Sequence, residues 1–198
     1  MKYENGYKHT IGYRDDKMHR DARNDIILTT VGLNIRIGQR LIREGNRKLS
    51  EFLGVSYIYL DNIRYGENTF PIRQGINMCQ YMRLTPNSIL DIEDRFMESD
   101  SRPEYINYEY TDKDIGERVS FFRFCSHMTL GQVSSELKNK NYPMSEYRLE
   151  KIEMGKETLT LVVFIRLMEI FKTNPDDFFD PEYKMRPSYA RYQAHGNG

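Results

Sequence analysis

The side chains suited to acid–base or nucleophilic chemistry are few and scattered in this sequence. The four histidines are His9, His19, His127 and His195. No nucleophile elbow or phosphate-binding loop accompanies them. The adjacent carboxylates Asp176 and Asp177 lie at an expected helix start, where complementing the helix dipole is favoured over catalysis. We therefore expect that the protein is not an enzyme.

The two cysteines do not indicate a metal site or a disulfide. Cys79 and Cys125 lie far apart in helical patterns, without a CxxC motif, and no second Cys/His pair accompanies Cys125 and His127. We expect no metal and no cofactor, in a reducing, cytoplasmic compartment. The N-terminus lacks an apolar signal core, and charged residues interrupt the longest apolar run, residues 159–171, so no membrane association is expected.

Charge lowers the expectation of unspecific nucleic-acid binding. The 29 basic residues balance 29 acidic ones, giving a formal net charge of zero, whereas a protein that coats nucleic acid is usually basic. A neutral total still allows the basic side chains to gather on one face.

One pattern of apolar residues, glycine and proline occurs twice. Corresponding positions are first 84 residues apart, namely Val31–Gly32 and Ile115–Gly116, Ile35 and Val119, and Leu49 and Val133. They are then 89 apart, namely Leu60 and Leu149, Ile63 and Ile152, Gly66 and Gly155, and Pro86 and Pro175. The offset changes once, in residues 138–143, opposite Gly54 of the first copy. An insertion confined to an expected turn between helices supports a true repeat.

The repeat predicts an all-α chain with two tandem five-helix units. These units span residues 26–95 and 115–180, and units this small benefit from contact with each other or with a second chain. The flanking segments are a polar arm, residues 1–25, a Tyr-rich acidic connector, residues 96–114, and a polar tail, residues 181–198. We expect Tyr105, Tyr108 and Tyr110 of the connector to pack on the neighbouring units.

Helical spacing predicts which residues of the first unit face its core. They are Ile26, Ile27, Val31, Ile35, Leu41 and Ile42, then Leu49, Phe52 and Leu53, Leu60 and Ile63, Ile72, Ile76, Cys79 and Met82, and finally Ile89 and Leu90. Gly54 should end the second helix, Val55 should turn inward and Ser56 should cap the third helix. Asn87 is the expected cap of the fifth. In the second unit the insertion should either lengthen the second helix or lift the third helix away from the first.

Residues 54–67, GVSYIYLDNIRYGE, and residues 145–156, SEYRLEKIEMGK, resemble the XRE/Cro-type helix-turn-helix family of phage and bacterial repressors. The resemblance covers about sixty residues in each half and implies a five-helix fold whose third helix lies in the major groove of DNA. It implies a sequence-specific, double-stranded DNA-binding transcriptional regulator, a repressor. The second copy departs from the family at its turn, which has no glycine.

The resemblance also implies which side chains face the bases. They are Tyr57, Ile58, Asp61 and Asn62 in the first copy, and Ser145, Tyr147 and Lys151 in the second. Asn62 can pair with adenine, Ile58 can contact a thymine methyl group, and Asp61 can accept from a cytosine amino group. The acidic residues of the second copy, Glu146, Glu150 and Glu153, make its third helix a poor binder of a polyanion. The family commonly packs a glutamate at the position of Glu153 against its own domain.

Phosphate contacts are expected from side chains near the second and third helices, together with backbone amides at the start of the second helix. These side chains are Arg43, Arg47, Lys48, Ser56, Arg64 and Lys156. Arg47 and Lys48 equally fit an ordinary solvated face.

Two readings of function remain open. In the first, the two units occupy successive half-sites as a pseudo-dimer, or two chains form a homodimer across a palindrome. In the second, the same scaffold binds a protein through Tyr-rich surfaces, as an antitoxin or a phage-encoded inhibitor of a nucleic-acid enzyme would. A DNA binder should gather Arg43, Arg47, Lys48 and Arg64 on one surface. A protein-binding module should show a continuous apolar and aromatic patch there.

Overall fold

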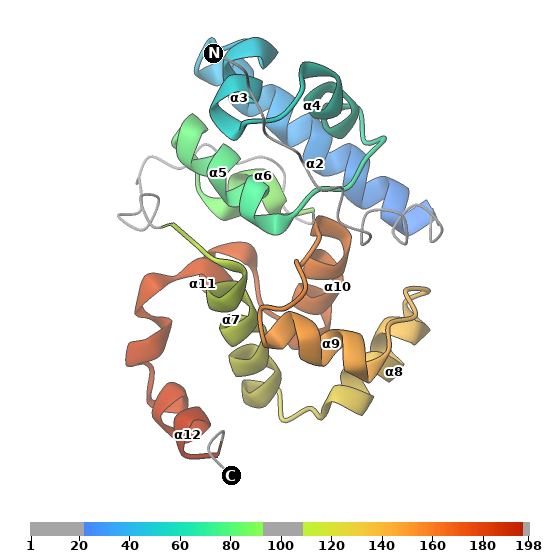
Figure 1. Ribbon diagram of the computed structural model, residues 1–198, viewed down its shortest axis with the longest axis vertical. Helices are drawn as coiled ribbons and strands as arrows, with labels where there is room; N and C mark the ends of the chain where they lie inside the picture. Colours follow the sequence, from blue (N-terminus) through green and yellow to red (C-terminus); the bar gives the residue numbers. More distant parts are fainter. Residues whose placement is uncertain (1–21, 93–108, 196–198) are drawn as a thin grey trace, which may run out of the picture.

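The computed structural model describes residues 22–92 and 109–195, and this part of the chain is all-α (Figure 1). The first helix group consists of α2 (Ala22–Leu41), α3 (Asn46–Leu53), α4 (Tyr57–Arg64), α5 (Ile72–Met82) and α6 (Pro86–Leu90). The second consists of α7 (Asp112–Cys125), α8 (Leu130–Asn139), α9 (Glu146–Glu153), α10 (Leu161–Phe171) and α11 (Pro175–Phe179). The 3-10 helix η2 (Pro181–Met185) and α12 (Pro187–His195) follow. Most of the predicted N-terminal arm, and Tyr105 and Tyr108, lie outside the described residues.

Buried apolar side chains follow the predicted helical period, with three exceptions. Ile27, Val31 and Ile35 of α2 are fully buried, whereas Ile26, Leu41 and Phe52 are about half exposed. The prediction was wrong for these three. Ile26 points away from the buried side of α2, because successive residues of a helix point about 100° apart and Ile27 is the buried one. Leu41 ends α2, and the ring of Phe52 packs at a tilt against that of Tyr81, with ring centroids 4.8 Å apart.

Two glycines let the first and third helices of each group touch backbone to backbone. A Cβ atom on Gly32 of α2 would stand 2.6 Å from the carbonyl oxygen of Arg64, at the end of α4. Gly116 of α7 has the same relation to the end of α9, where its Cβ would stand 2.6 Å from the carbonyl oxygen of Glu153. Helices α4 and α9 are thus held against long helices over their final turns.

The insertion in the second copy is absorbed without detaching α9. Helix α8 extends to Asn139, and Tyr142, which follows it, is buried and donates its backbone N–H to the carbonyl of Leu137 at 2.8 Å. Ser134 donates its hydroxyl to the carbonyl of Met144 at 2.6 Å. Helix α9 contacts both α7 and α8. The longer turn therefore lengthens the second helix and adds an aromatic plug beneath it.

The C-terminal segment differs from the expected polar tail. Over Pro181–His195 it forms η2 and α12, and α12 packs on α7. Tyr183 is buried, and with Tyr189 and Tyr192 it surrounds the ring of Phe121 at centroid distances of 5.3 to 5.8 Å. These aromatic contacts give the segment an apolar, buried side that its polar composition did not indicate.

Tyr110 is the connector tyrosine that the structure describes, and it is packed as expected. Its side chain is buried, its hydroxyl donates to the carbonyl of Phe179 at 2.6 Å, and the two rings meet edge to face. Arg118 lies beside it, buried, with its guanidinium 4.0 Å from the ring centroid of Tyr183 and donating to the carbonyls of Phe178 and Asp180. This cluster ties the connector to the end of α11.

Equivalent residues of the two helix groups meet each other at the seam between them. Pro71 and Thr160, which are 89 residues apart like the repeat itself, form an antiparallel bridge. Its two hydrogen bonds run from the N–H of Ile72 to the carbonyl of Leu159, and from the N–H of Leu161 to the carbonyl of Phe70, at 2.8 and 2.9 Å. Residue pairing of this self-equivalent kind is the signature of a two-fold axis.

A second self-equivalent contact joins α6 and α11. The N–H of Asn87 donates to the Asp176 carboxylate at 2.8 Å, and the N–H of Asp176 donates to the Asn87 side-chain oxygen at 2.9 Å. Asn87 therefore does not cap its own helix as predicted, because Thr85 takes that position and accepts from the N–H of Ser88. Each of the two residues instead satisfies a first-turn N–H of the opposite group. The helix groups are thus related by an approximate two-fold axis through these two contacts.

Breaking this reciprocal pair should loosen the seam measurably. We expect Asn87→Ala and Asp176→Ala each to lower the free energy of unfolding by about 1 kcal/mol, because each leaves a helix N–H without its acceptor. Urea unfolding followed by circular dichroism measures the change. Asn77→Ala, on an exposed position of α5, is the matched control and should have no measurable effect. If all three variants unfold alike, the pair does not stabilise the seam.

None of the helices in the described ranges has the length and apolar character needed to cross a membrane.

Candidate nucleic-acid interface

The turn between α3 and α4 has the predicted form. Gly54 adopts a left-handed conformation with φ 65° and ψ 30°, which ends α3, and the N–H of Val55 returns to the carbonyl of Ser50 at 3.0 Å. Val55 packs against the core, and the Ser56 hydroxyl accepts from the N–H of Tyr59 at 3.1 Å as the cap of α4. Because φ is positive at Gly54, any other residue there would strain this turn.

Helix α4 buries one face and presents the other. Leu60 and Ile63 lie in the core, whereas the side chains of Tyr57 and Ile58 are 54% and 71% exposed. Asn62 is half-buried, and its side chain makes no hydrogen bond to any residue in the described ranges. Three of the four predicted base-facing residues therefore lie on the accessible side of α4, and the Asn62 amide retains its donors and acceptor.

Asp61, the fourth predicted base-facing residue, is held within the first helix group. Its Oδ1 atom accepts from the Asn46 side-chain amide and from the Arg64 guanidinium, each at 2.9 Å. Gln39 in turn donates to the Asn46 side-chain oxygen at 3.1 Å. This chain of four polar side chains joins α2, the first residue of α3 and the end of α4. Asp61 thus positions α4 through its hydrogen bonds to Asn46 and Arg64. From the family resemblance, it was expected to face the bases.

The start of α3 gathers the predicted phosphate-contacting cations. Arg43 is exposed in the loop before it, Arg47 and Lys48 lie in its first turn, and the Asp61 contact brings Arg64 to the same end. The cap of α3 is Gly45, which is exposed and has no side chain to accept from the first N–H groups of the helix. An added Cβ at Gly45 would stand in open space. Backbone N–H groups and basic side chains therefore coincide at this end.

Most of these cations also contact a carboxylate. Arg47 pairs with Glu51 at 3.1 Å and Lys48 with Glu44 at 3.0 Å, both one helical turn apart. The hydrogen bond that Lys48 donates to Glu44, together with the Glu44 charge, raises the pKa of Lys48 above its ordinary value. Such exposed pairs are worth little, so a phosphate group can replace the carboxylate at low cost.

The second helix group is arranged differently at the equivalent positions. Ser145 caps α9 by accepting from the N–H of Arg148, and Tyr147 is exposed with the Lys151 ammonium 4.4 Å from its ring centroid. Interaction with Tyr147 raises the pKa of Lys151 above its ordinary value. Lys156 is exposed just beyond the helix. All three predicted base-facing residues of the second copy therefore interact within the chain, Ser145 as the cap of α9 and Tyr147 with Lys151.

The start of α8 is closed where that of α3 is open. Thr129 and Gln132 form a reciprocal capping box, with the Thr129 hydroxyl accepting from the N–H of Gln132 and the Gln132 side chain accepting from the N–H of Thr129. The Glu146 carboxylate lies over the same end, 3.1 Å from where a Cβ on Gly131 would stand. The start of α8 is thus covered by the negative side chain of Glu146, whereas the start of α3 is open.

Glu153, at the end of α9, packs against its own helix group. The Arg123 guanidinium donates two hydrogen bonds to its carboxylate, at 2.6 and 2.8 Å. The hydrogen bond to Glu153 raises the pKa of Arg123 above its ordinary value despite partial burial. A further ion pair, between Arg148 and Glu157, ties the outer side of α9 to the following turn. Sequence spacing did not indicate that pair, because its partners come from different elements.

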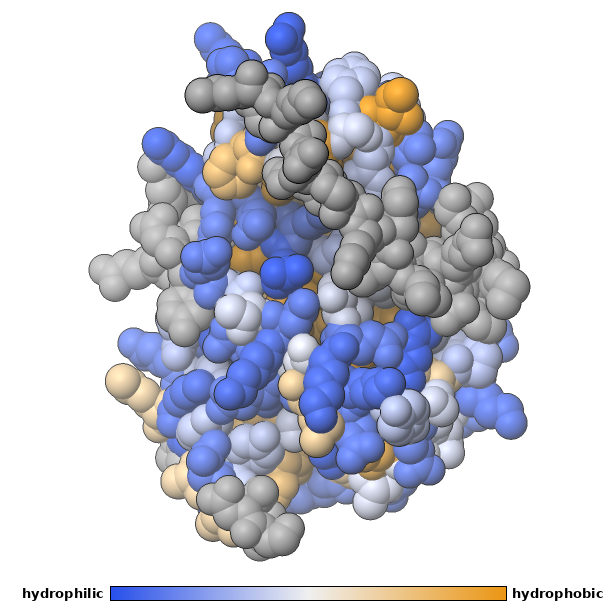
Figure 2. Space-filling model, in the orientation of Figure 1, coloured by the Kyte–Doolittle hydropathy of each residue, from blue (hydrophilic) through white to orange (hydrophobic). Residues whose placement is uncertain are grey.

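The visible surface carries scattered rather than continuous apolar groups. Figure 2 shows isolated hydrophobic residues among hydrophilic ones over the described part of this face. The exposed large apolar residues near α4 are Phe52, Tyr57, Ile58 and Tyr65, and those near α9 are Tyr147 and Met154. Both helix groups therefore present exposed aromatic side chains, and Phe52 lies in ring contact with Tyr81.

Compared with protein-family models, with curated proteins and with solved structures, the chain shows no match.

Proposed function

We propose that this chain is a sequence-specific regulator of transcription, a repressor, that reads double-stranded DNA with α4. The proposal treats the two helix groups as tandem helix-turn-helix units of the repressor type. The observation that carries it is the presentation of α4, which is capped by Ser56, buried through Leu60 and Ile63, and accessible through Ile58 and Asn62. A short, firmly seated helix with an accessible polar and apolar face is what major-groove readout requires.

The first unit supplies most of the affinity in this proposal. An open helix start with Arg43, Arg47 and Lys48 around it can hold a backbone phosphate through N–H groups and charge together. At the equivalent place in the second unit, the Glu146 carboxylate lies over Gly131 and would repel a phosphate. In this proposal the second unit orients the chain on the DNA but adds little to the binding affinity.

The approximate two-fold axis supports the pseudo-dimer over the homodimer. The bridge between Pro71 and Thr160 and the pair of Asn87 and Asp176 relate the units as two chains are related in a symmetric dimer. One chain would then offer α4 and α9 to two inverted half-sites, of which the first is read more strongly. No second chain is needed for this arrangement.

A protein-binding module, such as an antitoxin or an inhibitor of a nucleic-acid enzyme, is the second candidate. It is favoured by the exposed Tyr57, Ile58 and Tyr147, and by the engagement of Arg47 and Lys48 with carboxylates. Aromatic side chains of this kind are enriched in protein interfaces.

The deciding experiment selects random duplex DNA on the purified chain and follows binding of the enriched site over a salt series. We expect a defined motif, with Asn62→Ala weakening discrimination at one base pair by about 1–3 kcal/mol. Arg47→Ala should weaken binding to all sequences and reduce the salt slope by about one. Arg191→Ala, on exposed α12, is the matched control. If no motif is enriched and the variants bind alike, DNA readout is excluded and the protein-binding function stands.

A further inference from the structure

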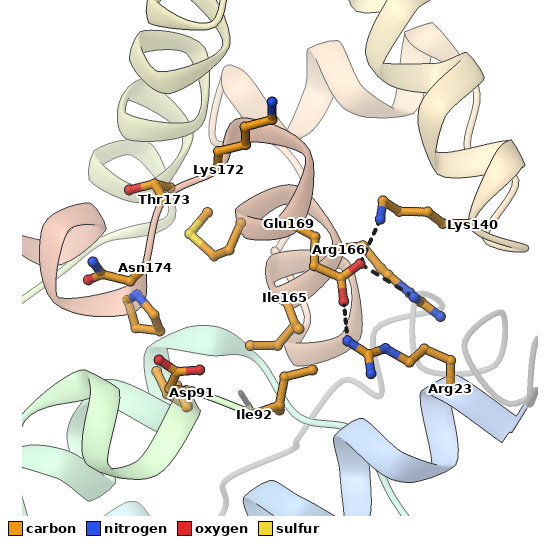
Figure 3. A pocket seen from close by; sticks show the side chains of 13 residues that line it. Arg23, Asp91, Ile92, Lys140, Ile165, Arg166, Glu169, Lys172, Thr173 and Asn174 are labelled. Atoms are coloured by element: carbon orange, nitrogen blue, oxygen red, sulfur yellow. Dashed lines mark hydrogen bonds and ion pairs between the residues drawn. The ribbon is translucent and has the colours of Figure 1, made fainter. Parts of the chain in front are cut away.

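A cavity of about 810 Å³ opens at the seam between the two helix groups (Figure 3). The first group lines it with Arg23 at the start of α2 and with Asp91 and Ile92 after α6. The second group lines it with Lys140 after α8, with several residues of α10, and with the segment that leads to α11. Its size is that of a site for a small molecule.

The described lining is positive although the whole chain is neutral. Two carboxylates, Asp91 and Glu169, face four cationic side chains, which are Arg23, Lys140, Arg166 and Lys172. Three of these cations converge on one carboxylate. Glu169 accepts from Arg23 through Oε1 at 2.9 Å, and from Lys140 and Arg166 through Oε2 at 3.0 and 3.5 Å.

The pKa of Glu169 indicates that the electrostatic potential in this cavity is positive. Burial acts to raise the pKa of Glu169, but hydrogen bonds from Arg23 and Lys140 and the nearby positive charges outweigh it, and the pKa is lowered below its ordinary value. A carboxylate that is only 13% exposed is therefore kept ionised by its surroundings. The same potential favours a second anion within the cavity.

The cavity also has an apolar side. Ile92 of the first group and Ile165 of the second lie close together in Figure 3, and Leu90 and Met168 also line the cavity. Lys140 points its ammonium group toward Glu169, whereas Lys172 lies at the opposite end of the lining and points its ammonium group away from Glu169 (Figure 3). Apolar surface beside convergent polar groups is the usual composition of a ligand site.

We propose that this cavity binds a small organic anion, with its carboxylate or phosphate group against Lys140 and Arg23 and its apolar body over Ile92 and Ile165. The site does not depend on the proposed DNA binding. Because both helix groups line the cavity, the ligand holds the groups together and stabilises the folded chain by mass action.

Isothermal titration calorimetry on the full chain, in a buffer without other multivalent anions, tests the site. The probes are 3-phenylpropionate, its uncharged amide and inorganic phosphate. We expect 3-phenylpropionate to bind at millimolar concentration or below, and the amide and phosphate each to bind at least about tenfold more weakly, which is about 1.4 kcal/mol. Thermal unfolding with and without 3-phenylpropionate should show a rise in Tm.

Two cationic variants and one control locate the binding. Lys140→Gln and Arg23→Gln should each weaken 3-phenylpropionate binding about tenfold. Lys138→Gln removes a neighbouring charge from the last turn of α8, outside the lining residues, and should bind as the original chain does. Equal binding of the acid and the amide, no binding of the acid, or an equal effect of Lys138→Gln would each overturn the proposal. Phosphate binding as strong as that of the acid would overturn the assignment to an organic ligand.

Discussion

Gly32→Ala is expected to lower the free energy of unfolding by about 2 kcal/mol, because the added methyl group meets backbone atoms that cannot turn aside. Its Cβ would stand 2.6 Å from the carbonyl oxygen of Arg64 and 2.8 Å from that of Ile63. Alanine also favours the helix by up to about 1 kcal/mol, but this gain is smaller than the cost of moving α4. If α4 reads DNA as proposed, its displacement should lower the DNA affinity more than tenfold.

Gly38→Ala separates the clash with α4 from the gain in helix propensity. Gly38 lies in the same helix as Gly32, so alanine there gains the same helix propensity. Its Cβ would meet the Sδ atom of Met82 and the Cδ1 atom of Leu84, which belong to flexible side chains that can turn aside. We expect its stability to change by less than about 1 kcal/mol. Guanidinium unfolding and DNA titration measure both variants. Equal behaviour of the two would show that the close contact between α2 and α4 does not position α4.

The double reversal Arg43→Glu and Arg47→Glu should weaken DNA binding about a hundredfold at low salt, because it removes two phosphate contacts and adds two repulsive charges. Both side chains are exposed at the start of α3, so the fold should survive the change. Fluorescence anisotropy with the selected duplex at several salt concentrations measures the loss, and circular dichroism checks the fold.

The matched reversal in the second unit is Lys151→Glu with Lys156→Glu. It introduces the same charge change in and after the last turn of α9, in the unit whose α8 start is covered by Glu146, so we expect less than about a fivefold loss of affinity. A similar loss from both double variants would mean that the two units bind phosphate equally. A negligible loss from the first double variant would place the DNA contacts elsewhere.

Elements that depend on neighbouring residues were predictable from sequence. The helical period identified the buried faces of α4 and α5, and the residue types at Gly54 and Ser56 identified the end of α3 and the cap of α4. Prediction was wrong where a long-range partner competes with a local one. Asn87, a suitable cap for its own helix, bonds instead with Asp176 of the other group. The tail, too polar to fold alone, packs on α7 through Tyr183.

By itself, the sequence determined the all-α class, the repeat, and the turn that presents α4, because periodicity, capping and positive φ act over a few neighbouring residues. Only the tertiary structure decided that Asp61 holds Asn46, that Glu146 covers the start of α8, and that Arg23 meets Glu169 across the seam. These contacts join residues 15 or more positions apart, and helix packing, not spacing along the chain, sets which charges meet.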